Sequence, residues 1–144
     1  MDKEELDLLL KEGEGLTVEF KEKFTPKIDE DVVAFANTRG GKILLGVSDH
    51  SQIVGQKLTN ELKARIIDLA RHCHPSIPVS VQSVGQVVAI TVQEGDEKPY
   101  SCSSGYYRRL DAVSQKMTQA EIRAIFRETT DAFFRGFASQ GFQF

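Results

Sequence analysis

The sequence has few cysteines and no long apolar run. Two thiols in 144 residues, Cys73 and Cys102, do not make the disulfide framework of a secreted domain, so we expect a reducing, cytoplasmic location. No apolar run approaches the roughly 20 residues of a membrane-spanning helix. The opening MDKEELDLLLKEG is acidic where a secretory signal is basic, so we expect no such signal.

The chain has no excess of positive charge, and its charges are unevenly distributed. The net charge is −3, and residues 1–31 carry 5 basic and 11 acidic side chains, whereas residues 32–144 carry 13 basic and 10 acidic ones. A protein that coats DNA nonspecifically would be basic throughout. The charge therefore argues against that class and leaves room for one basic face.

What the sequence does contain is a succession of helical and strand-like patterns of the length of one domain. Two capping boxes, Asp2-x-x-Glu5 and Thr118-x-x-Glu121, predict helices that end near Gly13 and Arg127. The remaining patterns predict, in chain order, a strand at LTVEFKEK, a helix over 28–38, a strand over 42–47, a helix from about 60 to 73, the hairpin VSVQSV/VVAITV, a polar loop, and a strand at YYRRL.

Several segments together resemble one known family. EGEGLTVEFKEK, VVAFANTRGGKILLGVSD, IVGQ, HPSIPV and KPYSCSSGYYRRL follow one another in the order and spacing of the Schlafen-type, Alba-like DNA-binding domain. The resemblance covers residues 4 to about 125. It implies an α+β fold with an Alba-like β-α-β-α-β-β core, to which this sequence adds an N-terminal helix, a C-terminal strand and a C-terminal helix.

The tail differs in composition from the rest of the chain. It places five phenylalanines in the last twelve residues, and three of them, Phe133, Phe134 and Phe137, suit one helical face. A folded domain does not normally leave such a cluster in water. We expect a domain over 1–128 and a tail over 129–144 that packs on the domain, on a missing domain, or on a second subunit in a homodimer.

The segment FANTRGGKILLGVSD raises the question of phosphate binding. A Walker-type loop needs a strand, then a glycine-rich loop ending in Lys and Ser or Thr, then a helix. Here the order is reversed and the hydroxyl residue is missing, so ATPase activity is not supported and Gly40 and Gly41 are explained by a turn. Arg39 and Lys42 flank that turn and are candidates for nucleic-acid contact, with a solvated turn as the alternative.

The strand YYRRL offers one ring and one guanidinium on each face. Tyr106 and Arg108 share one side, and Tyr107 and Arg109 share the other. Aromatic stacking combined with phosphate pairing suits nucleic acid, so all four residues are binding candidates. The alternative is an edge strand with solubilising arginines.

Three carboxylates, Glu14, Glu19 and Asp49, fall beside two predicted strands and would converge at one end of a sheet if those strands pair. Such a group can bind Mg²⁺ or Mn²⁺ and polarise a phosphodiester. The Schlafen resemblance implies the same, because its nuclease branch uses three acidic residues at these positions. Lys21 would lie on the same face as Glu19 and contact phosphate. The alternative is that these carboxylates are simply solvated.

The sequence therefore favours a nucleic-acid (DNA) binding domain of a transcriptional-regulator-type protein that needs no cofactor for binding. A divalent-metal endoribonuclease acting on tRNA or rRNA is the second hypothesis, so enzyme activity stays open. The third is a dimerisation domain that binds no nucleic acid.

Overall fold

The computed structural model describes the backbone of residues 1–139 and the side chains of residues 1–129. Its elements are α1 (Lys3–Glu12), β1 (Val18–Lys21), α2 (Ile28–Asn37), β2 (Gly41–Leu45), α3 (Asn60–Arg71), β3 (Val79–Val84), β4 (Val87–Val92), β5 (Ser101–Cys102), β6 (Gly105–Leu110), β7 (Val113–Lys116) and α4 (Gln119–Ser139). The α+β fold with an Alba-like core is confirmed, and the core runs from β1 to β4.

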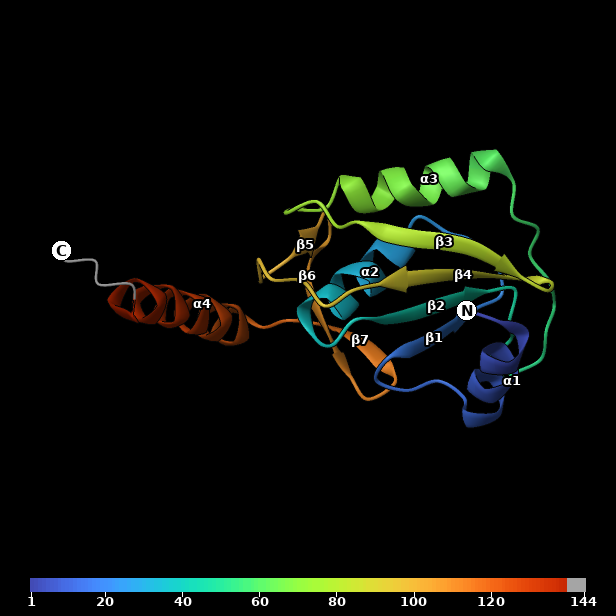
Figure 1. Cartoon of the computed structure of the whole chain (residues 1–144), viewed down its shortest axis with the longest axis horizontal. Helices are drawn as coiled ribbons and strands as arrows, with labels where there is room; N and C mark the ends of the chain where they lie inside the picture. Colours follow the sequence, from blue (N-terminus) through green and yellow to red (C-terminus); the bar gives the residue numbers. More distant parts are fainter. Residues whose placement is uncertain (140–144) are drawn as a thin grey trace.

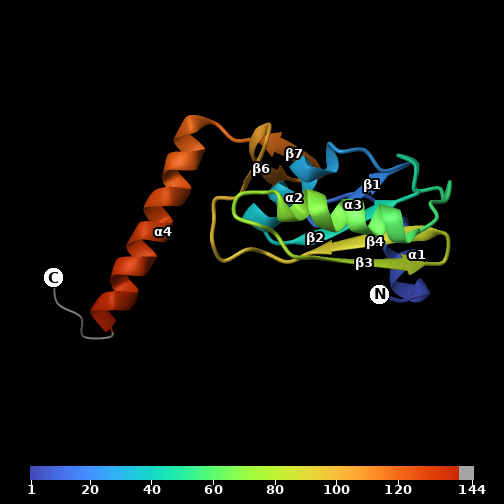
Figure 2. The same ribbon diagram turned by 90° about the horizontal axis from the view of Figure 1, so that it is seen from above.

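The central layer is a four-stranded sheet with the order β1-β2-β4-β3 (Figure 1). Strands β1 and β2 are parallel, and the other pairs are antiparallel. Helix α1 covers one face, whereas α2 and α3 cover the other (Figure 2). A second sheet, β5-β6-β7, packs on the far side of α2, so this helix lies between two sheets.

Sequence explains where these helices begin and why α2 is buried. The Asp2 side chain accepts a hydrogen bond from the Glu5 amide at 2.9 Å, and Thr59 caps α3 in the same way. Helix α2 is apolar around most of its circumference, with Val32–Ala36 no more than 1% exposed. A helix with such a surface is stable only when other layers cover it on several sides.

The C-terminal part differs from the prediction in two respects. Only the strand at β6 was predicted in this part, but the structure has three strands. The other two were missed because β5 is only two residues long and the exposed β7 has no apolar alternation. The last helix was predicted to end near Arg127 and instead continues to Ser139. The predicted packing or dimer contacts Phe133, Phe134 and Phe137 lie outside the described side chains.

In the described residues 1–139, no helix is both long and apolar enough to cross a bilayer.

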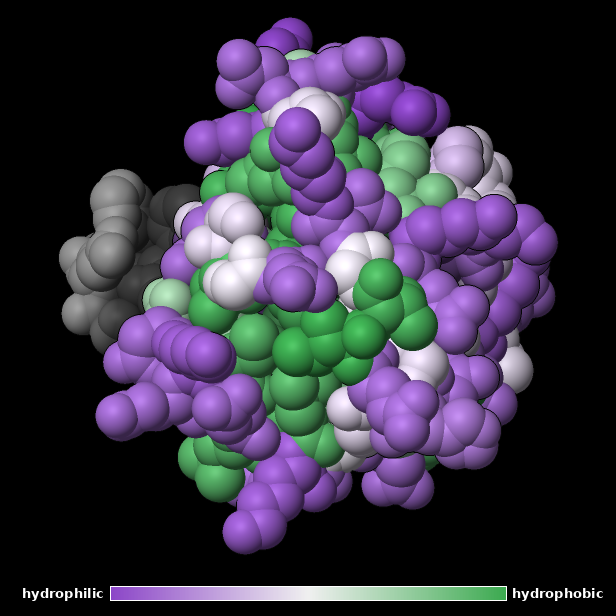
Figure 3. Space-filling view, turned by 90° about the vertical axis from the view of Figure 1, so that its right-hand side faces the viewer, coloured by the Kyte–Doolittle hydropathy of each residue, from purple (hydrophilic) through white to green (hydrophobic). Residues whose placement is uncertain are grey.

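Figure 3 shows the end of the molecule where α1 and the β3–β4 turn lie, with apolar side chains gathered near its centre. Among the elements at this end, α1 exposes Leu8, and the loop after β2 exposes Ile53 and Val54. The α2–β2 turn lies at the opposite end of the sheet, beside β6 (Figure 1).

Candidate nucleic-acid interface

A tight turn brings Glu14 beside Glu19. The Gly15 amide donates to the Val18 carbonyl at 3.0 Å, so the chain before β1 doubles back along that strand. Burial raises the pKa of Glu14 to about 8, assisted by a hydrogen bond with the Glu19 carboxylate, by the charge of Glu19 and, more weakly, by that of Asp49. The raised pKa favours the protonated form of Glu14 at neutral pH.

Asp49 belongs to the same neighbourhood but stands further off. It follows β2, the strand next to β1, and is exposed to solvent, and its charge is felt at Glu14. Among the side chains of residues 1–129, however, no three His, Cys, Asp or Glu residues lie close enough together to hold a metal ion. The carboxylates as placed do not fit a Mg²⁺ or Mn²⁺ site, and a catalytic role for them stays a prediction.

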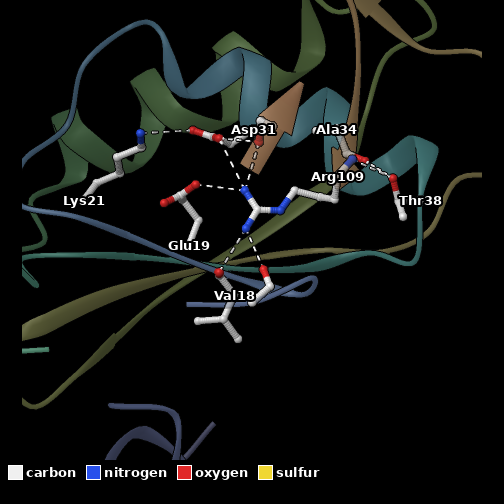
Figure 4. Close-up of polar contacts among 9 residues, drawn as sticks. Val18, Glu19, Lys21, Asp31, Ala34, Thr38 and Arg109 are labelled. Atoms are coloured by element: carbon white, nitrogen blue, oxygen red, sulfur yellow. Dashed lines mark hydrogen bonds and ion pairs between the residues drawn. The ribbon is translucent and has the colours of Figure 1, made fainter. Parts of the chain in front are cut away.

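The buried guanidinium of Arg109 fixes the inner side of Glu19 (Figure 4). Nη1 of Arg109 donates to Glu19 Oε1 at 2.8 Å, and Nη2 donates to the carbonyls of Gly15 at 2.6 Å and Val18 at 3.2 Å. The guanidinium also lies 4.7 Å from the centre of the Phe35 ring. Arg109 thus ties β6 of the small sheet to the outer edge of β1 in the large one.

Two further polar residues complete this network, and sequence reasoning missed both. Ser114 accepts from Arg109 Nη1 at 3.0 Å and donates to Asp31 Oδ1 at 2.6 Å. Burial raises the pKa of the Asp31 carboxyl, while Ser114 and the charge of Lys21 oppose that rise. Lys21, a candidate phosphate contact, has its Nζ 3.7 Å from Asp31. The missed signal was a charged residue in the apolar helix IDEDVVAFAN.

The inward side of β6 requires a correction. Arg109 and Tyr107 were predicted to contact nucleic acid, but Arg109 is 3% exposed and Tyr107 is 7% exposed. Both side chains face α2 because β6 packs along that helix. Their backbone is fixed there too, since Asn37 Nδ2 donates to the Tyr107 carbonyl and Thr38 Oγ1 accepts from the Arg109 amide. These two residues stabilise the fold and present no surface to a ligand.

The glycine pair after α2 is explained by close packing. Gly40 has φ of 74°, and a Cβ there would lie 2.6 Å from the Val92 carbonyl oxygen. A Cβ on Gly41 would lie 2.6 Å from both the Phe35 ring and the Thr17 carbonyl oxygen. The glycines therefore let the chain turn against its neighbours, as expected, and neither is needed to explain a phosphate contact.

The residues that flank this turn border a hollow of about 220 Å³. Arg39 is exposed, and Lys42 Nζ donates to Thr91 Oγ1 at 3.1 Å from the neighbouring strand. Two cations and no carboxylate line the hollow, together with Leu9, Thr17, Val18, Gly41, Thr91, Val92 and Gln93. Hydroxyl, amide and cationic groups of this kind are the ones that contact nucleic-acid backbones.

The outward side of β6 has a different character from its inward side. Tyr106 and Arg108 are partly exposed, and Arg108 forms an ion pair with Glu121 in the first turn of α4. Arg108 is next in the chain to Arg109, whose amide bonds to Thr38, and Thr38 is next to Arg39. The two predicted cationic segments therefore lie side by side, although Glu121 already engages Arg108.

Comparison with known proteins now decides the family. A family model described as Schlafen, AlbA_2 matches residues 14–118, which is well over half of the chain. The chain belongs to the Schlafen AlbA_2 family. No curated protein matches it. The crystal structure of the DIP2311 protein from Corynebacterium diphtheriae resembles it with a TM-score of 0.59 and 20% identity, over 79% of this chain and 24% of that one. This likeness supports the fold alone, since the chain spans about a quarter of that protein.

In this Schlafen AlbA_2 domain, the matched range begins at Glu14 and stops at Thr118, one residue before α4. It therefore contains the carboxylate pair, the α2–β2 turn and strand β6. Membership of the family indicates a nucleic-acid-related domain. Helix α4 lies beyond the matched range.

Proposed function

We propose that this Schlafen AlbA_2 domain binds DNA through the end of the molecule that carries Arg39, Lys42 and Arg108, as the nucleic-acid-binding part of a transcriptional regulator. The observation that carries the proposal is the hollow beside the α2–β2 turn, which two cations line without any carboxylate. A phosphate placed there would meet no negative charge on the residues that line the hollow, although Glu94, next to Gln93, lies close enough for the charge of Arg39 to lower its pKa. This matters in a chain whose net charge is −3.

The setting of Thr38 supports a continuous interface. Its carbonyl accepts from Lys98 Nζ at 3.4 Å, while its hydroxyl accepts from the Arg109 amide at 2.9 Å. Lys98 thus approaches the turn from one side and β6 from the other, with Arg39 next along the chain. Lys98 is also paired with Glu94, so Arg39 and Lys42 should supply most of the attraction.

Tyr106 gives this interface a feature suited to an unpaired base. Its ring lies on the outward side of β6, on the same side as Arg108. Stacking on an aromatic ring tolerates any base, and phosphate contacts carry no sequence information. We therefore expect affinity with little sequence preference from these residues.

Fluorescence anisotropy with labelled duplex DNA, single-stranded DNA and RNA of one sequence tests the proposal. The double variant Arg39→Ala/Lys42→Ala should bind the preferred nucleic acid about tenfold or more weakly than the native chain. Lys57→Ala/Lys63→Ala is a matched control, because it removes the same charge from exposed residues of the loop before α3 and of α3 itself. Equal losses of affinity in the two variants would contradict the assignment of Arg39 and Lys42 to the interface. Tighter binding of RNA than of DNA would show that the natural ligand is RNA.

A second candidate function is divalent-metal-dependent cleavage of RNA. The observation that favours it is the contact between Glu14 and Glu19, with the charge of Asp49 close by. Because the three carboxylates do not form a metal site as placed, this function would require Asp49 to move inward when metal and RNA bind.

Incubation with tRNA and Mn²⁺ tests this second candidate. Asp49→Asn is the cleanest variant, since Asp49 is exposed and bonds to no structural arginine. Glu19→Gln would also weaken the partner of a buried guanidinium, so its folding must be checked by circular dichroism. Cleavage that survives both substitutions would exclude the carboxylate site.

A further inference from the structure

The two free cysteines of the chain flank a hydrogen-bonded bridge. His74, just after α3, and Ser101, in β5, exchange two backbone hydrogen bonds, each 2.8 Å long. In an antiparallel pairing, the residue before one partner faces the residue after the other. The next pair along this bridge is therefore Cys73 and Cys102.

The surroundings of the two thiols agree with that pairing. Cys73 is 3% exposed and Cys102 is 8% exposed, and both belong to the same core cluster. Burial, with smaller contributions from the nearby Cys102 and Asp29, raises the pKa of the Cys73 thiol to about 12. Cys102 lies next to the exposed turn residues Ser103 and Ser104. Cross-strand neighbours next to a hydrogen-bonded pair fall within the Cα separation that a disulfide bridges.

We propose that Cys73 and Cys102 form a reversible intramolecular disulfide when the protein meets a disulfide oxidant such as oxidised glutathione. This redox site lies outside the proposed nucleic-acid interface and goes beyond the proposed function. In the reduced chain the Cys73 thiol lies 3.6 Å from the Leu69 carbonyl, and the Cys102 thiol lies 3.4 Å from Ser104 Oγ. The Cys102 thiol also lies 3.6 Å from the Gly105 carbonyl and hydrogen-bonds to the Asp29 side chain, so formation of the disulfide would break a few weak thiol hydrogen bonds.

The chemistry starts at Cys102, which lies nearer to the surface. Its thiolate attacks the disulfide of oxidised glutathione, giving a mixed disulfide and one glutathione thiolate. The Cys73 thiol then loses its proton to water, and its sulfur displaces the second glutathione thiolate. In total the two cysteines lose two protons and two electrons, and one oxidised glutathione becomes two reduced molecules.

The bond would fasten the end of α3 to β5. It would close a loop of about 30 residues and so restrict the unfolded chain, which stabilises the fold. It would also fix the segment that leads from Lys98 to Arg108 against α3. Oxidation would therefore make the segment between Lys98 and Arg108 more rigid, at one side of the proposed nucleic-acid interface.

Intact-mass spectrometry of the whole chain, treated with oxidised glutathione and then alkylated, tests the proposal. The native chain should lose two hydrogens, carry no glutathione and no alkyl group, and return to two free thiols with dithiothreitol. Cys73→Ser should retain one glutathione on Cys102, whereas Cys102→Ser should react far more slowly. The oxidised native chain should also unfold at a higher urea concentration than the reduced one.

Three outcomes would overturn the proposal. One is a native chain that keeps two free thiols when folded, although urea makes both react with the oxidant. Another is a stable glutathione adduct on the native chain without closure of the internal bond. The third is a disulfide that joins two molecules, which size-exclusion chromatography under non-reducing conditions would reveal.

Discussion

The two sides of strand β6 carry the same pair of residue types in different environments. On the inward side, Tyr107 and Arg109 are buried against α2, and the guanidinium of Arg109 reaches Glu19 and the edge of β1. On the outward side, Tyr106 and Arg108 remain partly exposed beside α4. Neighbouring arginines can thus differ completely in burial, and the packing of the strand decides which of them solvent can reach.

The largest expected effect separates Arg109 from Arg108. Arg109→Ala leaves Glu19 buried without its partner and should lower the free energy of unfolding by about 3–5 kcal/mol. Arg108→Ala removes a partly exposed ion pair and should cost about 1 kcal/mol or less. Urea denaturation followed by circular dichroism measures both. Similar losses in the free energy of unfolding for the two variants would contradict the view that only the inward side of β6 stabilises the fold.

The next effect concerns the residue that holds the inward side in place. Asn37 donates to the carbonyls of Tyr100 and Tyr107 and accepts from the Tyr100 amide at 2.7 Å, so it joins α2 to the small sheet. Asn37→Ala leaves these buried groups unpaired and should cost about 1–3 kcal/mol. The exposed Asn60 provides a control, since Asn60→Ala should change the urea midpoint far less.

A smaller effect should appear in the dependence of stability on pH. The pKa of Glu14 is raised from 4.5 to about 8 on folding, so the folded chain holds this proton more tightly than the unfolded one. Its stabilisation is complete below pH 4.5 and is lost as the pH rises to about 8. Glu14→Gln should therefore make thermal stability less dependent on pH across this window.

The control for that experiment is Glu12→Gln, which alters an exposed carboxylate of α1. Its melting temperature should follow the native pH profile, because Glu12 is exposed and is not one of the groups that raise the pKa of Glu14. A Glu14→Gln variant with the native profile would mean that the proton does not reside on this carboxyl pair.

The smallest expected effect concerns the contribution of Arg108, on the outward side of β6, to DNA affinity. Arg108→Ala should lower affinity for duplex DNA only a few-fold, because Glu121 already neutralises part of its charge. Glu121→Gln should raise affinity by releasing the guanidinium. Anisotropy at one salt concentration measures both changes, and a loss of affinity on Glu121→Gln would remove Arg108 from the interface.

Much of the fold could be predicted from local patterns. The capping residues Asp2 and Thr59 and the alternation of β1 each carry their own signal, and the family resemblance supplied the Alba-like core. Strand β5 could not be predicted, because two residues show no period. Its pairing with His74 depends on a contact far along the chain.

The site was predicted less completely, for a related reason. Alternation placed Tyr107 and Arg109 on one side of β6 but could not say that α2 would cover that side. Glu14, Glu19 and Asp49 were predicted to converge. The turn at Gly15 brings Glu14 to Glu19, but the three carboxylates do not form a group that could hold a metal ion among the residues described. Ser114 gave no usable signal, and Asp31 gave only its charge within the apolar helix α2, because the contact between these two residues spans 83 positions of the chain.

The salt dependence of DNA affinity tests the central claim most directly, namely that Arg39 and Lys42 bind phosphate in the hollow beside the α2–β2 turn. Log affinity falls as log salt concentration rises, and this fall should be less steep for Arg39→Ala/Lys42→Ala than for the native domain. The slope should differ by about 1.8, or about 0.9 for each phosphate that is no longer neutralised. Lys57→Ala/Lys63→Ala should keep the native slope. A double variant at the turn with an unchanged slope, or a control with the same decrease, would contradict the account.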